Sequence, residues 1–95
     1  MKDYFVYILK CSDDSYYTGV TNNLEKRFSE HQSGIIKGYT SKRLPVRLVF
    51  SERLTDINQA IRFEKQIKGW NRKKKGALIN RDIDLLVQLS NLKKE

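Results

Sequence analysis

The sequence predicts one α+β domain, an α/β sandwich, in which two strands, a helix, a third strand and two helices are followed by an additional C-terminal helix. Residues 4–9 are apolar or aromatic at every position, which is typical of a central strand covered on both faces. Later segments place apolar residues at helical spacing. With 95 residues and no repeat or linker, we expect a single domain over residues 1–95, with a core over about 4–80 and the last helix over about 81–93.

The first two strands are predicted at residues 4–10 and 16–20, on either side of a polar turn. A helix should follow over residues 23–33. Asn22 with Glu25 three residues later has the pattern of a capping box, and Gly34 suits the left-handed residue that ends a helix.

Two polar side chains share the core-facing side of this helix. Successive helical residues turn by about 100°, so Arg27 and His31 lie on the same side as Leu24 and Phe28. An arginine and a histidine that face a core need a polar partner there. We therefore expect this side of the helix to form part of a functional site.

The third strand is predicted at residues 46–54, after a basic loop at 35–43, with Leu48, Val49 and Phe50 in its core. A helix from Asp56 to near Gly69 should follow this strand. After it, a short helix with a basic outer face is predicted at residues 73–79, and the last helix should begin after a cap at Asn80 or Asp82. The leucines of the last helix are expected to pack on the domain or to serve dimerisation.

The helix after the third strand carries a second inward polar residue. It should begin at Asp56, where Gln59 completes a capping box, and end near Gly69. Glu64 falls in the middle of its apolar stripe. A buried carboxylate is costly unless it is paired or binds a cation, so Glu64 either forms an ion pair with an inward Arg or holds a metal ion.

Composition favours an anionic partner. Nineteen Lys and Arg against eleven Asp and Glu give a net charge of +8, which suits a polyanion such as nucleic acid. The cationic segments lack an apolar face opposite the charge, which argues against a membrane surface. The candidate nucleic-acid contacts, taken from the two basic clusters and their aromatic neighbour, are Lys37, Tyr39, Lys42, Arg43, Lys68, Arg72, Lys73 and Lys74.

Several classes of protein are disfavoured. We expect no membrane span and no signal peptide, so the cytoplasm is the expected compartment. The single cysteine, Cys11, forms no internal disulfide, and one histidine without a cysteine pair gives no zinc spacing. A bound metal would therefore be a hard ion held by oxygen.

Two tyrosine triplets and the arginine that follows them resemble a known signature. FVY at residues 5–7 and YTG at residues 17–19, with Arg27 on the next helix, are similar to the motif of the GIY-YIG nuclease superfamily. The first glycine and the isoleucine of the second triplet are replaced, whereas both tyrosines, the second glycine and the spacing are kept. This resemblance implies a GIY-YIG endonuclease-like fold, a three-stranded antiparallel sheet flanked by helices.

The resemblance also implies a metal-dependent endonuclease that hydrolyses phosphodiester bonds in DNA, in a branched, damaged or single-stranded form during repair or recombination. It assigns Tyr7 or Tyr17 to the attacking water, Arg27 to the phosphate oxygens, and Glu64 to a single Mg²⁺ or Mn²⁺. His31 is either the general base or the partner of a tyrosine hydroxyl. A free tyrosine is a poor base and would need a neighbouring cation to act near neutral pH. The residues alone therefore do not decide whether a tyrosine or His31 is the general base.

Two alternatives compete with a nuclease. The chain could be a non-catalytic nucleic-acid-binding module that retains the nuclease fold, or a protein that pairs with a partner or with itself through the C-terminal helix. An inward Glu beside an inward Arg favours the nuclease, because binding alone requires neither. DNA is favoured over RNA as the partner.

Overall fold

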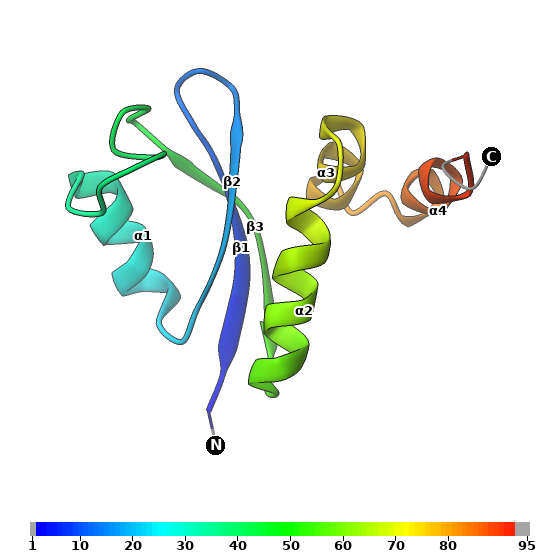
Figure 1. The fold of residues 1–95 in the computed structure, drawn as a ribbon, viewed down its shortest axis with the longest axis horizontal. Helices are drawn as coiled ribbons and strands as arrows, with labels where there is room; N and C mark the ends of the chain where they lie inside the picture. The colour runs from blue at the N-terminus through cyan, green and yellow to red at the C-terminus, as the bar shows by residue number, and fades with distance from the viewer. Residues whose placement is uncertain (1, 93–95) are drawn as a thin grey trace.

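The computed structural model describes residues 2–92 and contains the expected order of elements (Figure 1). The elements are β1 (Tyr4–Lys10), β2 (Tyr16–Thr21), α1 (Leu24–Ser33), β3 (Arg47–Leu54), α2 (Ile57–Lys68), α3 (Arg72–Ile79) and α4 (Ile83–Leu92). The last helix was predicted to reach residue 93, which lies outside the described residues.

The three strands form one antiparallel sheet in the order β2-β1-β3, which confirms the predicted fold class and the central place of the first strand. In the pairing of β1 with β2, Tyr7 lies opposite Gly19 and Leu9 lies opposite Tyr17. Both candidate catalytic tyrosines therefore stand on one face of the sheet, because alternate residues of a strand share a face.

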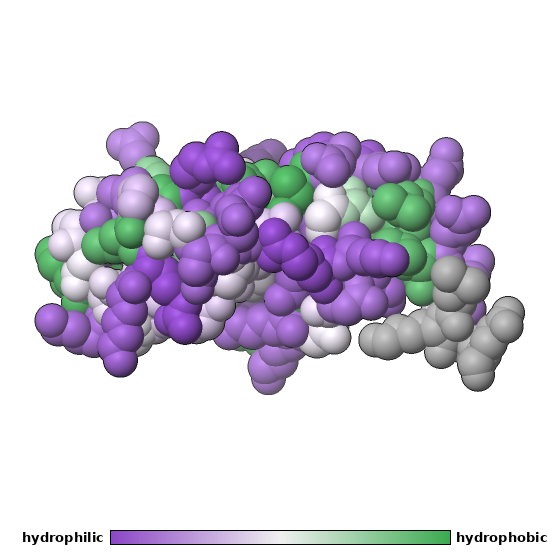
Figure 2. All heavy atoms as spheres, turned by 90° about the horizontal axis from the view of Figure 1, so that it is seen from above, coloured by the Kyte–Doolittle hydropathy of each residue, from purple (hydrophilic) through white to green (hydrophobic). Residues whose placement is uncertain are grey.

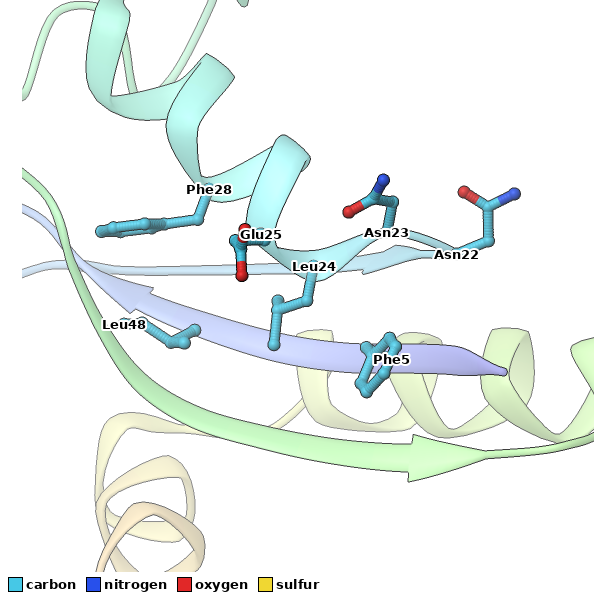
Figure 3. A pocket seen from close by; sticks show the side chains of 7 residues that line it. All are labelled: Phe5, Asn22, Asn23, Leu24, Glu25, Phe28 and Leu48. Carbon is cyan, nitrogen blue, oxygen red and sulfur yellow. The ribbon is translucent and has the colours of Figure 1, made fainter. Parts of the chain in front are cut away.

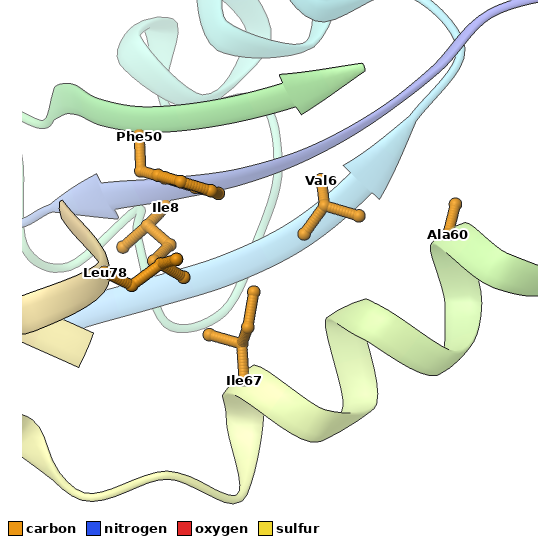
Figure 4. Close-up of a cluster of buried hydrophobic side chains, with 6 residues drawn as sticks. All are labelled: Val6, Ile8, Phe50, Ala60, Ile67 and Leu78. Atoms are coloured by element: carbon orange, nitrogen blue, oxygen red, sulfur yellow. The ribbon is translucent and has the colours of Figure 1, made fainter. Parts of the chain in front are cut away.

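Each face of β1 contributes to its own core. Val6 and Ile8 pack with Phe50 of β3 and with Ala60 and Ile67 of α2 (Figure 4). On the other face, Tyr7 and Leu9 pack with Cys11 and Val46, and with Leu24 and Phe28 of α1 at the edge. Burial on both sides explains why residues 4–9 show no alternation of apolar and polar side chains.

The helix boundaries differ from the predictions by about one residue. Asn23, not Asn22, caps α1, because its Oδ1 accepts a hydrogen bond of 3.1 Å from the backbone N–H of Lys26. Gly34 ends α1 with φ of 80°, as expected for the left-handed position. Asp56 caps α2 and Asp82 caps α4 through their side-chain oxygens.

The prediction that Leu48 lies in the core of the third strand is wrong, since its side chain is 40% exposed. A shift in register places Phe50 opposite Ile8 but Leu48 opposite Leu9. The bulge turns Leu48 toward the α1 side of the sheet, where it lines an open, mainly apolar pocket (Figure 3). The remaining lining residues are Phe5, Asn22, Asn23, Leu24, Glu25 and Phe28.

Helix α4 extends away from the sheet (Figure 1) and packs mainly on α3. Leu86 contacts the core, whereas Ile83, Leu85 and Val87 are exposed. Apolar surface is visible at this end of the molecule in Figure 2. Of the described helices, none is both long and apolar enough to cross a membrane.

Candidate active site

The ring of Tyr7 lies across Gly19 on the neighbouring strand. A Cβ atom built on Gly19 would come within 2.5 Å of the Tyr7 hydroxyl oxygen and 2.6 Å of the ring carbon that carries it. No side chain fits in that space. The missing side chain of Gly19 therefore makes room for the ring of Tyr7.

His31 is fully buried in the last turn of α1 and has a partner on each ring nitrogen. Its Nε2 lies 2.9 Å from Tyr7 Oη, and its Nδ1 lies 2.8 Å from Thr40 Oγ1. The inward direction predicted from helical spacing is therefore observed, and the polar partners of His31 come from β1 and from the loop between α1 and β3.

Burial sets the protonation states of this pair. It raises the pKa of Tyr7, and the nearby Arg27 guanidinium offsets the rise only in part. Burial, together with the positive charge of Arg27, lowers the pKa of His31. Near neutral pH, Tyr7 is therefore protonated and His31 is neutral, and a neutral imidazole can accept a proton.

Arg27 lies one turn before His31, at the edge of the same site. The hydrogen bond with the Tyr7 hydroxyl raises the pKa of Arg27 further, so the guanidinium keeps its positive charge at all relevant pH values. The guanidinium also forms a loose ion pair of 3.6 Å with Glu30. It lines a polar hollow together with Lys26, so two cations face solvent at this point.

Tyr17 connects the site to the basic loop. Its ring centroid lies 5.0 Å from that of His31 and 6.2 Å from that of Tyr39, with which it stacks. The guanidinium of Arg43 lies 3.8 Å above the ring of Tyr39, and its Nε donates a 2.9 Å hydrogen bond to Asp13. These contacts hold a row of aromatic and cationic groups beside His31.

Glu64 is 8% exposed on α2, in agreement with its predicted inward direction. Its ion-pair partner is Lys68 at 2.6 Å, one helical turn later, and not an inward Arg. Its negative charge acts on Tyr7, where it raises the pKa. The pKa of Tyr7 thus responds to charges on both helices, because Arg27 of α1 lowers it and Glu64 of α2 raises it.

The donor set around Glu64 suits a hydrated Mg²⁺. The described part of the chain has no cluster of three or more His, Cys, Asp or Glu side chains that could enclose an ion. Mg²⁺ commonly keeps several waters and binds through one or two carboxylates plus substrate phosphates. Glu64 is the only buried carboxylate among the described residues, so it could supply one such ligand, and in this structure it is paired with Lys68 Nζ.

The residues predicted to contact nucleic acid occupy different environments. Lys37, Lys42 and Lys73 are exposed. Arg72 donates a hydrogen bond to the Asp14 carbonyl oxygen and lies over the Tyr16 ring. Lys74 does not fit the prediction of a basic outer face, because it is 5% exposed and its ammonium lies over the Trp70 ring.

The five candidate catalytic residues lie outside the apolar pocket of Figure 3. Sequence reasoning did not identify Thr40 as the partner of His31, and no local pattern signals it, because the contact depends on the path of the loop. It also did not identify Lys68 as the partner of Glu64. The spacing of four residues on a helix was the available signal.

Known proteins are similar to this chain over most of its length. The model of the GIY-YIG catalytic domain matches residues 3–77. The UPF0213 protein of Natronomonas pharaonis is 43% identical over 77 residues, which cover 81% of this chain and 91% of that protein.

Two solved structures are also similar to this chain. The solution structure of the UPF0213 protein BH0048 from Bacillus halodurans has a TM-score of 0.56 and 38% identity, covering 82% of this chain and 83% of that one. The solution structure of the protein EF2693 from E. faecalis has a TM-score of 0.57 and 30% identity, and the match covers 100% of this chain and 91% of that one. The chain therefore belongs to the GIY-YIG family.

Proposed function

We propose that this protein is a metal-dependent endonuclease that hydrolyses phosphodiester bonds in DNA. Its family is a family of nucleases. The observation that supports the proposal most directly is the 2.9 Å hydrogen bond between Tyr7 and a buried, neutral His31, with Arg27 beside it. Together these groups can accept a proton from water and stabilise a phosphate.

The proton is transferred through two side chains. Tyr7 takes a proton from the attacking water while its own proton passes to Nε2 of His31, which becomes an imidazolium ion. Tyr7 need not ionise before the reaction, so its raised pKa is no obstacle. This scheme gives Tyr7 the contact with water and His31 the role of base, and Tyr17 helps to position the substrate.

Arg27 and Glu64 act on the phosphate. The permanent charge of Arg27 stabilises the negative charge that develops on the phosphate oxygens. Glu64 would hold a single Mg²⁺ or Mn²⁺, which supplies Lewis-acid stabilisation of the leaving oxygen when bound. To bind the ion, Glu64 must release Lys68, whose half-exposed side chain can move into solvent.

The basic segments on both sides of the site would bind the DNA backbone. Lys37 and Lys42 lie on the loop, and Lys68, Arg72 and Lys73 lie at the end of α2 and the start of α3. Hydrophilic side chains cover much of the middle of the molecule in Figure 2. We propose that the substrate is branched, damaged or single-stranded DNA and that it is cleaved in the cytoplasm during repair or recombination. We further propose that the protein pairs through α4 with a protein partner or with a second copy of itself.

A second candidate is a non-catalytic nucleic-acid-binding module. The observation that favours it is the ion pair of Glu64 with Lys68, which already neutralises the carboxylate that would hold the metal. A binding module would keep this pair closed in the presence of Mg²⁺. The two functions therefore differ in metal dependence.

Cleavage assays test the proposal. We expect the protein to cut at least one form among labelled single-stranded, duplex, nicked, flapped and branched DNA and matching RNA, with Mg²⁺ or Mn²⁺ but not with chelator. Glu64→Gln keeps the size of the side chain and should abolish this cleavage while binding is retained. Binding without cleavage in every condition would instead support the module.

The Glu64–Lys68 pair can be tested by stability alone. Lys68→Met leaves Glu64 buried without its cation, and because Lys68 is half-exposed we expect a loss of about 1 kcal/mol, or roughly 4–8 °C in Tm for a domain of this size. Millimolar Mg²⁺ should restore much of this loss and change the wild type less. Lys65→Met, an exposed lysine on the same helix, is the control. Equal effects of Mg²⁺ on all three proteins would contradict a metal site at Glu64.

A further inference from the structure

Thr40 is a buried residue within an exposed loop. Its side chain is 1% exposed, whereas Tyr39 and Lys42 on either side are exposed. Its Oγ1 lies 2.8 Å from Nδ1 of His31, whose other nitrogen contacts Tyr7. The three side chains form a continuous chain of hydrogen bonds from β1 through α1 to the loop.

A neutral imidazole has one donor nitrogen and one acceptor nitrogen, so this chain can run in two directions. The phenol of Tyr7 is far more acidic than an aliphatic hydroxyl and is therefore the better donor. Arg27, which can only donate, lies beside the Tyr7 oxygen and competes for its acceptor capacity. Both facts favour Tyr7 O–H donating to Nε2 and Nδ1–H donating to Thr40.

We propose that Thr40 is a positioning residue of the reaction: by accepting the Nδ1–H of His31, it keeps Nε2 free to take the proton of Tyr7. This role rests on the proposed nuclease function. During the transfer the Tyr7 O–H bond breaks, the Nε2–H bond forms, and the Nδ1–H bond to Thr40 is kept. A partner on the second nitrogen fixes the tautomer and the ring orientation, as in other histidine-dependent sites.

The loop is built to hold Thr40 in place. The backbone N–H of Arg43 donates a 3.0 Å hydrogen bond to the Thr40 carbonyl oxygen, and the Arg43 side chain is anchored on Asp13. On the other side, Tyr39 stacks on Tyr17 of β2. The basic loop thus carries predicted nucleic-acid contacts and the partner of the general base in the same few residues.

NMR can test the tautomer directly, because His31 is the only histidine of the chain. In the ¹⁵N-labelled full chain near neutral pH, we expect the ring signals of a neutral imidazole with the proton on Nδ1. A proton on Nε2, or an equal mixture of the two tautomers, would overturn the proposal. This measurement requires no nuclease activity and no substitution.

Two variants connect the tautomer to catalysis. Thr40→Val keeps the shape but removes the acceptor of the Nδ1–H, so we expect a weaker preference for this tautomer and a fall in kcat of roughly 10- to 100-fold with little change in KM. Thr40→Ser keeps the hydroxyl and should retain both. Equal losses in the two variants would show that packing matters and the hydrogen bond does not, which would overturn the proposal.

The pKa of His31 provides a second readout. The charged and titratable groups around His31 are Tyr7 on β1, Tyr17 on β2, and Arg27 and Glu30 on α1. The NMR titration should give a pKa below the usual 6.5, and Thr40→Val should lower it further because the imidazolium loses an acceptor. An unchanged or higher pKa in Thr40→Val would overturn the proposal.

The outcomes separate this proposal from the proposed function. Cleavage by a wild-type protein with the proton on Nε2 would overturn the role of Thr40 alone. The Nδ1–H tautomer in a protein that cleaves no substrate would overturn the nuclease function, and with it any catalytic role of Thr40.

Discussion

Replacement of Arg27 by alanine is expected to reduce cleavage roughly 100- to 1,000-fold, because the proposed site loses the permanent charge that stabilises the phosphate in the transition state. Arg27 borders a hollow on the surface, and the buried Tyr7 hydroxyl beside it keeps its hydrogen bond to His31 when Arg27 is removed. We therefore expect stability and DNA binding to change little. Single-turnover cleavage with saturating protein, beside a binding assay on the same substrate, would measure the two effects separately.

Two further variants make the Arg27 test specific. Lys26→Ala removes the neighbouring cation of the same hollow and should weaken binding slightly at unchanged cleavage rate. Arg27→Lys keeps the charge but not the planar fork and should recover only part of the rate. A loss of binding in Arg27→Ala as large as its loss of cleavage would mean that Arg27 serves affinity, and would contradict its role in the transition state.

The sequence predicted best where a pattern reports local geometry. Helical spacing predicted that His31 and Glu64 point inward, and both are buried in the structure. The continuous apolar run at residues 4–9 predicted a central strand, because a strand covered on both faces has no polar side. These signals depend on residues within one element, and they sufficed for the order of elements and the fold class.

The sequence could not predict features that depend on how elements meet. The bulge that exposes Leu48 arises from the pairing of β3 with β1, and the burial of Lys74 depends on Trp70 across a helix start. The contact of Thr40 with His31 depends on a loop that returns to α1. Predictions from periodicity treated each element alone and therefore missed all three.

The departures from the family triplets lie away from the candidate catalytic groups. Thr18, in place of the isoleucine, is paired with Ile8 in the sheet and is buried on the opposite face from Tyr17 and Gly19. Phe5, in place of the first glycine, lines the apolar pocket beside α1. Neither change removes a group that could hold water, phosphate or a metal ion, which supports a catalytic function.

Gly19→Ala tests the most restrictive contact in the site. The new Cβ would lie 2.5 Å from Tyr7 Oη, so the ring must move, and we expect a destabilisation of about 1–3 kcal/mol. Movement of the ring also breaks the hydrogen bond to His31, so cleavage should fall to the level of Tyr7→Phe. Denaturant unfolding and cleavage assays measure the two losses.

A matched control and a double variant identify the cause. Gly76→Ala lies in helix α3, where a Cβ meets no atom within 4 Å, and should be neutral or stabilising by up to about 1 kcal/mol. In a Tyr7→Ala background the space across Gly19 is empty, so Gly19→Ala should cost far less than in the wild type. An equal cost in both backgrounds would place the strain in the backbone of β2 and would contradict the view that Gly19 exists to seat the tyrosine.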